Sequence, residues 1–244
     1  MRTVDLNSDM GEGCPNDAEL MRYVSSANIA CGYHAGDADT MRRTIDLALA
    51  DRVAIGAHPG YRDRENFGRT TMSLPPEEVI DLVAEQIRSL EEICLQRGAK
   101  LHHVKPHGAL YNQAAKDKDL AAAIAEAVTS FDSNLILYGL SGSYLISEAE
   151  SAGLNTASEV FADRTYRPDG TLTPRSEPNA LITNARQCVE QVIQMVESRT
   201  VTATDGSVIG IKADTICVHG DGENAVEFAR AIRQALGARL EPRP

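Results

Sequence analysis

Strand-like and helix-like segments alternate along almost the whole chain, and this alternation constrains the fold more than any other feature. Short apolar runs are each followed by a polar loop and then by an amphipathic stretch with a helical period. The expected strands are 3–6, 28–31, 53–57, 101–105, 135–138, 156–160 and 215–219. The expected helices are 39–50, 76–97, 119–131, 144–151, 185–198 and 224–236. Such alternation predicts parallel strands joined by right-handed helical crossovers.

Two architectures fit this pattern, an open doubly wound sheet and a closed barrel. The turn after the first strand contains Pro15 and lacks the third glycine of a dinucleotide-binding fingerprint, and no G-x-x-x-x-G-K-[ST] phosphate loop occurs. We therefore predict an α/β fold, a distorted (β/α)7-type TIM-like barrel, as a single domain over residues 1–238. A β-hairpin excursion is expected near 201–209 on the two-residue turn Asp205-Gly206, and the tail 239–244 is expected to be frayed.

Composition excludes several classes of partner. The net charge of −11 argues against nucleic acid, because duplex binding requires a basic surface. No run of apolar residues is long enough to cross a membrane, and the amino-terminal residues become polar too early for a secretory signal. The five cysteines are widely spaced and form no C-x-x-C pair, which is typical of reduced thiols. We expect a cytoplasmic protein with no nucleic-acid or membrane partner.

Ionisable residues collect at the carboxyl ends of the expected strands. Four of the six histidines lie there, on four different strands. A single histidine in such a place is more often an ordinary core residue, but burying a whole set without purpose would cost several kcal/mol each. In parallel barrels this end carries the site. We therefore predict the catalytic residues Asp9, His34, His58, Lys105, His107 and His219.

Further polar residues share the faces of these strands or lie in the loops that follow them. The predicted substrate-binding residues are Asp5, Asn7, Asn28, Gly108, Tyr111, Asn112, Glu159, Arg164 and Asp221. The segment 106–112 begins a helix whose first N–H groups would be available to a carboxylate. Two long loops, 59–74 and 161–178, carry arginines suited to clamping an anion.

Seven motifs in the same regions resemble a known family. They are 5–12 (DLNSDMGE), 27–37 (ANIACGYHAGD), 56–61 (GAHPGY), 67–69 (FGR), 104–112 (VKPHGALYN), 159–164 (EVFADR) and 217–221 (CVHGD). On these motifs, which follow one another in the family's order across nearly the whole chain, the sequence resembles the LamB/YcsF family. The departures are small, with Tyr33 where the family often has Phe and Ala38 where it often has Pro.

The resemblance implies a barrel similar to that of the glycoside hydrolase/deacetylase superfamily. It also implies that the chain is one part of a three-part ATP-dependent 5-oxoprolinase, which hydrolyses the lactam of 5-oxo-L-proline to L-glutamate. ATP would then be a co-substrate, with Mg²⁺ as its counterion, and the partners would be the B and C subunits of that enzyme. Because the chain has no phosphate loop, the place where ATP binds is not identified.

Our hypothesis for the chemistry divides the predicted catalytic residues into groups. Asp9, His34 and His58 would position or activate a water molecule that attacks the carbonyl carbon. Lys105 and His107 would stabilise the negative charge that develops on the oxygen. A further group, His219 or Asp221, would carry the proton.

Two other functions remain open at this point. One is a metal-dependent deacetylase or amidohydrolase that acts alone, in which Asp9 (or Asp5) with His34 and His58 would hold the metal. The H-E-x-x-H spacing of a helical zinc site is absent, and the metal ligands stay unknown. The other is a non-catalytic subunit that binds a lactam and turns nothing over.

Overall fold

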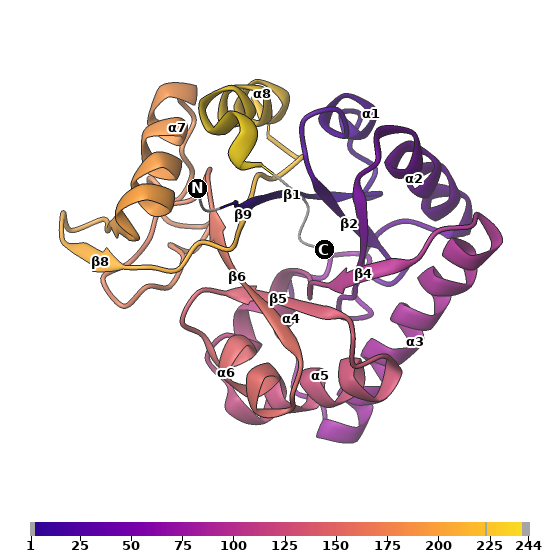
Figure 1. The fold of residues 1–244 in the computed structure, drawn as a ribbon. Helices are drawn as coiled ribbons and strands as arrows, with labels where there is room; N and C mark the ends of the chain where they lie inside the picture. Colours follow the sequence, from indigo (N-terminus) through magenta and orange to yellow (C-terminus); the bar gives the residue numbers. More distant parts are fainter. Residues whose placement is uncertain (1–2, 223, 241–244) are drawn as a thin grey trace.

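The computed structural model describes residues 3–222 and 224–240, and its centre is a closed barrel of parallel strands (Figure 1). The strands follow one another around the barrel in chain order, and the last pairs with both the first and the sixth. They are β1 (Asp5–Met10), β2 (Ser26–Ala30), β3 (Ala54–His58), β4 (Leu101–Val104), β5 (Ile136–Leu140), β6 (Asn155–Phe161) and β9 (Thr215–Cys217). The predicted seven-stranded (β/α) barrel is therefore confirmed.

Helices surround the barrel on its outside, except for α4, which lies at the cavity end of the barrel (Figure 1). They are α1 (Asp17–Leu20), α2 (Ala38–Asp51), α3 (Pro76–Gln96), α4 (Gly108–Ala114), α5 (Lys118–Phe131), α6 (Tyr144–Ser151), α7 (Ala185–Ile193) with the π-helical turn η1 (Gln194–Ser198), and α8 (Ala225–Leu236) with the 3₁₀ turn η2 (Gly237–Arg239). The sequence pattern does not predict α1, because four residues establish no hydrophobic period. Within the described part of the chain, none of these helices combines the length and the apolar character that a membrane crossing requires.

The regular alternation is interrupted by the antiparallel pair β7 (Thr200–Thr202) and β8 (Val208–Gly210), at the left of Figure 1. Its loop closes through hydrogen bonds from Ala203 N to Ser207 O and from Gly206 N to Ala203 O. Gly206 has a φ of 86°, in the left-handed region that favours glycine. The loop therefore has three residues, and the predicted two-residue turn is wrong.

Arg239 and Leu240 pair with the start of the chain, contrary to the prediction of a frayed tail. Leu240 bridges to Val4, and the amide of Val4 donates to the carbonyl oxygen of Arg239 at 2.8 Å. The expectation of a frayed tail is therefore wrong for Arg239 and Leu240. The rest of that tail, 241–244, lies outside the described residues.

The barrel interior is polar, whereas the apolar core lies between the strands and the helices. On β1, Leu6 belongs to the apolar core, while Asp5 and Asn7 lie inside the barrel and are fully buried. The Asp5 carboxylate accepts hydrogen bonds from the hydroxyls of Ser25, Ser26, Thr215 and Tyr138. This network forms a fixed polar floor beneath the carboxyl ends of the strands.

Gly56 on β3 shows how tightly this interior is packed. The His103 ring is fully buried, stacks on Tyr138 with centroids 4.1 Å apart, and shares a hydrogen bond of 2.7 Å with Asn28 Oδ1. A Cβ at position 56 would lie 2.1 Å from His103 Nε2. We expect Gly56→Ala to lower the free energy of unfolding by about 1–3 kcal/mol, as measured by urea denaturation.

Gly210 on β8 provides the matched control. A Cβ added there meets no atom within 4 Å among the described residues, and Gly210 is not among the glycines with positive φ. Gly210→Ala should change the free energy of unfolding by less than about 0.5 kcal/mol. Equal stability of the two variants would contradict the packing described here.

Candidate active site

A cavity of about 600 Å³ opens at the carboxyl ends of the barrel strands. Ten of the residues predicted from the sequence line it: Asp9, His58, Lys105, His107, Gly108, Tyr111, Asn112, Arg164, His219 and Asp221. They come from β1 and β3, from α4, and from the loops after β4, β6 and β9, so segments far apart in the sequence meet around one opening. The geometry on which the sequence interpretation depends is therefore present.

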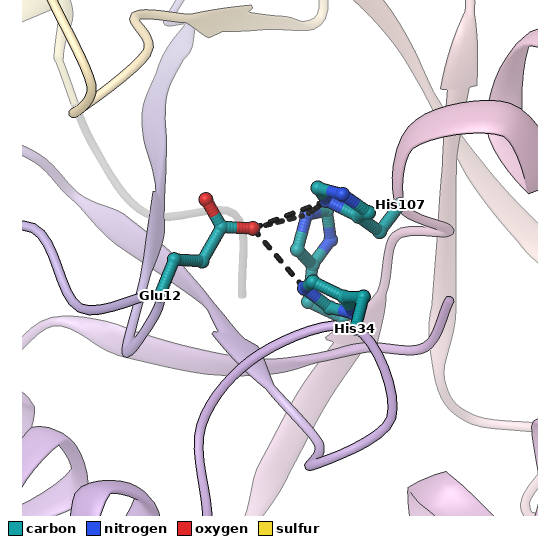
Figure 2. A group of neighbouring side chains, drawn as sticks. Glu12, His34 and His107 are labelled. Carbon is teal, nitrogen blue, oxygen red and sulfur yellow. Dashed lines mark hydrogen bonds and ion pairs between the residues drawn. The ribbon is translucent and has the colours of Figure 1, made fainter. Parts of the chain in front are cut away.

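A carboxylate that the sequence interpretation does not select lies at the centre of the histidines. Glu12 Oε1 lies 3.1 Å from His34 Nε2 and 3.1 Å from His107 Nδ1 (Figure 2). It also lies 3.6 Å from His58 Nε2. Burial raises the pKa of Glu12, but the neighbouring rings of His107 and His34 outweigh it and hold that pKa well below its usual range. Glu12 is therefore an ionised acceptor.

Backbone carbonyls fix the orientation of two of these histidines. His58 Nδ1 donates to the Lys105 carbonyl oxygen at 2.7 Å, and His107 Nε2 donates to the Phe67 carbonyl oxygen at 2.8 Å. In the neutral rings the lone pairs are then on His58 Nε2 and His107 Nδ1, which lie 2.9 Å apart. Burial lowers the pKa of His58, but the nearby charge of Asp9 raises it above the usual value. A positive charge is therefore favoured between His58 Nε2 and His107 Nδ1.

His34 lies behind this group and does not line the cavity. Its ring stacks on that of His107 with centroids 3.7 Å apart and planes within 4° of parallel. Burial lowers the pKa of His34 to about 4, so that its ring is neutral and Nε2 donates to Glu12. His34 therefore orients Glu12 through this hydrogen bond and does not contact the cavity.

Lys105 and Asp9 form a buried ion pair at the base of the cavity. Lys105 Nζ lies 2.8 Å from Asp9 Oδ1 and 2.9 Å from Glu159 Oε1. Burial lowers the pKa of Lys105, but Asp9 outweighs it and raises that pKa well above its usual value. Burial raises the pKa of Asp9, but His58 and Lys105 hold it well below its usual range. Both groups are therefore charged near neutral pH, and Asp9 Oδ2 lies 3.5 Å from His58 Nε2.

On the other side of the cavity, Asp163 orients His219. Asp163 Oδ2 accepts from His219 Nδ1 at 2.9 Å and from the His219 backbone amide at 3.2 Å. Burial raises the pKa of Asp163, but the charge of His219 outweighs it and lowers that pKa. Because Nδ1 is held by Asp163, Nε2 is the nitrogen of His219 that is available for proton transfer.

The rim of the cavity carries more positive than negative charge. Arg69 Nη2 and Arg175 Nη1 both donate to Asp221 Oδ2, at 3.1 and 2.9 Å. Arg164 is buried and donates from Nη2 to the Thr173 carbonyl oxygen, while its Nε has no hydrogen-bond partner among residues 3–222 and 224–240. Lys116 and Asp117 also line this part of the cavity, so four cationic side chains against two carboxylates favour an anionic ligand here.

Comparison with known proteins identifies the family that shares this arrangement. A model of the LamB/YcsF family matches residues 4–241. The chain belongs to the LamB/YcsF family. It is 54% identical over 241 residues to the 5-oxoprolinase A subunit of Brevibacillus brevis, a match that covers 97% of this chain and 95% of that protein. It is 53% identical over 238 residues to the 5-oxoprolinase A subunit of Oceanobacillus iheyensis, covering 96% and 93%.

Solved structures agree with this assignment. The lactam utilization protein from Thermus thermophilus superposes with a TM-score of 0.91 at 44% identity, and the match covers 100% of this chain and 99% of that one. A putative cellobiose-phosphate cleavage protein from Enterococcus faecalis, at 12% identity and a TM-score of 0.55, covers 98% of this chain and 96% of its own and shares the fold alone.

In this LamB/YcsF chain four predicted substrate-binding residues lie below the cavity and do not line it. Asn7 Nδ2 donates to Glu159 Oε1 at 3.0 Å, and Asn28 Nδ2 donates to Asp9 Oδ1 at 2.8 Å. The prediction that Asp5, Asn7, Asn28 and Glu159 contact substrate is therefore corrected, because none of the four lines the cavity. Asn7 and Glu159 bind Lys105 from beneath, and Asn28 binds Asp9. Asp5 is bound by hydroxyl groups and contacts neither histidine, so it is not the metal ligand that the deacetylase alternative allows.

The start of α4 also differs from its predicted role. The amide of Ala109, expected to be available to a ligand, donates to the Gly68 carbonyl oxygen at 2.9 Å. Asn112 Nδ2 donates to the Gly108 carbonyl oxygen, and the hydroxyl of Tyr111 donates to Glu159 Oε2 at 2.7 Å. In this LamB/YcsF protein the segment therefore shapes the cavity wall, and the amide of Ala109 is already used.

Proposed function

We propose that this LamB/YcsF protein is the A subunit of an ATP-dependent 5-oxoprolinase, and that it hydrolyses the lactam of 5-oxo-L-proline to L-glutamate. The observation that carries the proposal is the buried Asp9–Lys105 pair, which faces one cavity together with His58 and His219. This cavity combines a base, a fixed positive charge and a proton carrier, which are the three groups that amide hydrolysis requires. The two relatives named as 5-oxoprolinase A subunits support the choice of substrate.

In this proposal a water molecule adds to the lactam carbonyl carbon as Asp9 takes one of its protons. The ammonium group of Lys105 stabilises the negative charge on the carbonyl oxygen. The ring C–N bond then breaks, and the nitrogen takes a proton from His219, whose ring Asp163 orients. The nitrogen becomes the amino group of glutamate, and the added oxygen becomes part of its side-chain carboxylate. His58 and His107, held by backbone carbonyls, keep the water in place beside Asp9.

ATP makes this step easier, because transfer of its terminal phosphoryl group to the carbonyl oxygen, with release of ADP, leaves the carbon a better electrophile. Water addition and ring opening then give an acyl phosphate, and a second water molecule hydrolyses it to the side-chain carboxylate and inorganic phosphate. We propose that ATP with Mg²⁺ is the co-substrate and that the B and C subunits supply its site, since this chain has no recognisable phosphate loop. The cytoplasmic location expected from the sequence, where ATP is abundant, stays a prediction.

The substrate carboxylate has a natural place at the rim. Arg164, with its Nε unpaired among the described residues, and the Arg69–Arg175 pair offer planar donors to an anion. A carboxylate bound there would leave the lactam ring directed toward the base of the cavity, where Asp9 and Lys105 lie.

The test is to co-express the chain with its B and C partners and to measure glutamate formation from 5-oxo-L-proline. We expect glutamate only when ATP and all subunits are present. Amide or acetyl hydrolysis by the chain alone, without ATP, would favour the stand-alone metal-dependent deacetylase or amidohydrolase. Calorimetric binding of 5-oxo-L-proline to a His58→Gln variant that still supports full turnover would favour a non-catalytic binding subunit.

A further inference from the structure

Three electron-pair donors converge on the cavity wall, and no cationic side chain of the described residues lies between them. They are His58 Nε2, His107 Nδ1 and Glu12 Oε1, and the three separations are 2.9, 3.1 and 3.6 Å. The tautomers of both rings are set by their carbonyl partners, so that neither of these nitrogens carries a proton in the neutral ring. Lone pairs this close repel one another unless a cation lies between them.

The separations are those of a metal coordination sphere. Nitrogen and oxygen ligands lie about 2.0–2.2 Å from Zn²⁺, so two ligands at a tetrahedral angle are about 3.3 Å apart. We propose that Glu12, His58 and His107 bind one divalent transition-metal ion of the zinc class on the cavity wall. Two imidazoles and one carboxylate form a donor set of this kind, with the remaining position open toward the cavity.

The surroundings of the three residues fit this role. Histidines that bind metals usually donate their other ring N–H to a carbonyl or carboxylate, as His58 and His107 both do. His34 is not a fourth ligand, because a lone pair lies in the plane of its ring and the His34 ring is stacked parallel to that of His107. Instead its Nε2 donates to Glu12 and orients that carboxylate.

A second cluster of possible ligands, formed by Asp9, Cys217 and His219, is less suited to a cation. The ammonium group of Lys105 lies 2.8 Å from Asp9 Oδ1 and 3.2 Å from Cys217 Sγ, and its charge repels a metal ion. His219 Nδ1 is already held by Asp163. Because the two clusters are close together, one variant in each cluster is needed to show which of them binds the ion.

The test is calorimetric titration of Zn²⁺ into the 244-residue chain after dialysis against a chelator. We expect one equivalent to bind, with an affinity at least about a hundredfold lower in Glu12→Gln and His107→Gln. His219→Gln is the matched control and should bind as the unsubstituted chain does. Circular dichroism shows whether each variant is folded. Binding of one equivalent by the unsubstituted chain and by His219→Gln is expected whether or not Glu12→Gln and His107→Gln fold.

Co²⁺ gives a second measurement that does not depend on any loss of binding. A tetrahedral nitrogen–oxygen site should give intense visible absorption bands at one equivalent in the unsubstituted chain. The proposal is overturned if no equivalent of either ion binds, because a proton shared between His58 and His107 then supplies the positive charge. It is also overturned if His219→Gln abolishes binding. The ion needs no lactam, so these outcomes are independent of the proposed function.

Discussion

Asp9→Asn is expected to lower the turnover of the assembled enzyme by about 10²–10⁴-fold while the barrel stays folded. The carboxylate of Asp9 is ionised because His58 and Lys105 hold its pKa low, and it borders the cavity where the water would lie. Asparagine has nearly the same shape and keeps an oxygen for Lys105 Nζ and Asn28 Nδ2. What it loses is the ability to take a proton, so the effect should be on kcat.

The matched control is the rim carboxylate of the same cavity. Asp221→Asn removes a charge that Arg69 and Arg175 share, and it leaves the Asp9–Lys105 pair intact. We expect its main effect on KM for 5-oxo-L-proline, with kcat changed less than about tenfold. Steady-state kinetics at saturating ATP separates the two parameters, and urea denaturation checks the fold. Similar kcat values for the two variants would rule out Asp9 as the base.

Lys105→Met should both destabilise the protein and abolish turnover. The ammonium group lies between Asp9 and Glu159, and both carboxyl groups are buried. Without it, the buried Glu159 loses its cation and Asp9 keeps only His58 as a counter-charge, which is expected to cost about 3–5 kcal/mol of unfolding free energy. Activity should fall because no positive charge then lies beside the carbonyl oxygen.

The double variant Lys105→Met with Glu159→Gln separates these two roles. Replacing Glu159 by its neutral isostere removes one of the uncompensated acids, so we expect much of the lost stability to return. Turnover should stay at the level of Lys105→Met, since the charge near the substrate is still missing. Recovery of activity together with stability would mean that Lys105 acts only through the fold. Urea denaturation and glutamate formation are the two measurements.

The sequence predicts the elements and the shared cavity well because both follow from periodicity. Strand alternation correctly places Asp5, Asn7 and Asp9 on one face of β1, and the barrel brings strand ends together. Alternation fails where a strand has already ended. It assigns residue 34 to a strand face, but β2 ends at Ala30 and Gly32 has a φ of 98°, so His34 reaches the site by a loop.

Glu12 escapes prediction for the same physical reason. It lies between Gly11 and Gly13, which have φ values of 73° and 87°, and the direction of a side chain in such a turn has no period. An acid between two glycines directly after a strand is the signal that could have found it. The metal site that we propose also has no local spacing, because its ligands come from three separate segments of the chain.

The depth of a residue within the barrel is a further property that alternation does not contain. Alternation predicts the correct face for Asn28 and Glu159 but not their position along the barrel axis. That position depends on how neighbouring strands are staggered. Asp9 pairs in register with Asn28, and Glu159 pairs with Thr215. Only the closed barrel shows that Asn28 donates to Asp9 and that Glu159 accepts from Asn7 beneath the cavity.

The hydroxyl-bound floor around Asp5 has a practical consequence for anyone who wishes to adapt this scaffold to other cyclic amides. Each floor residue is tied to several others, so a change of size or polarity there will disturb the whole scaffold before it alters selectivity. The exposed positions of the arginine-bearing loops 59–74 and 161–178, such as Arg69 and Arg175, are the better targets for a library, because they border the opening and lie outside the buried network.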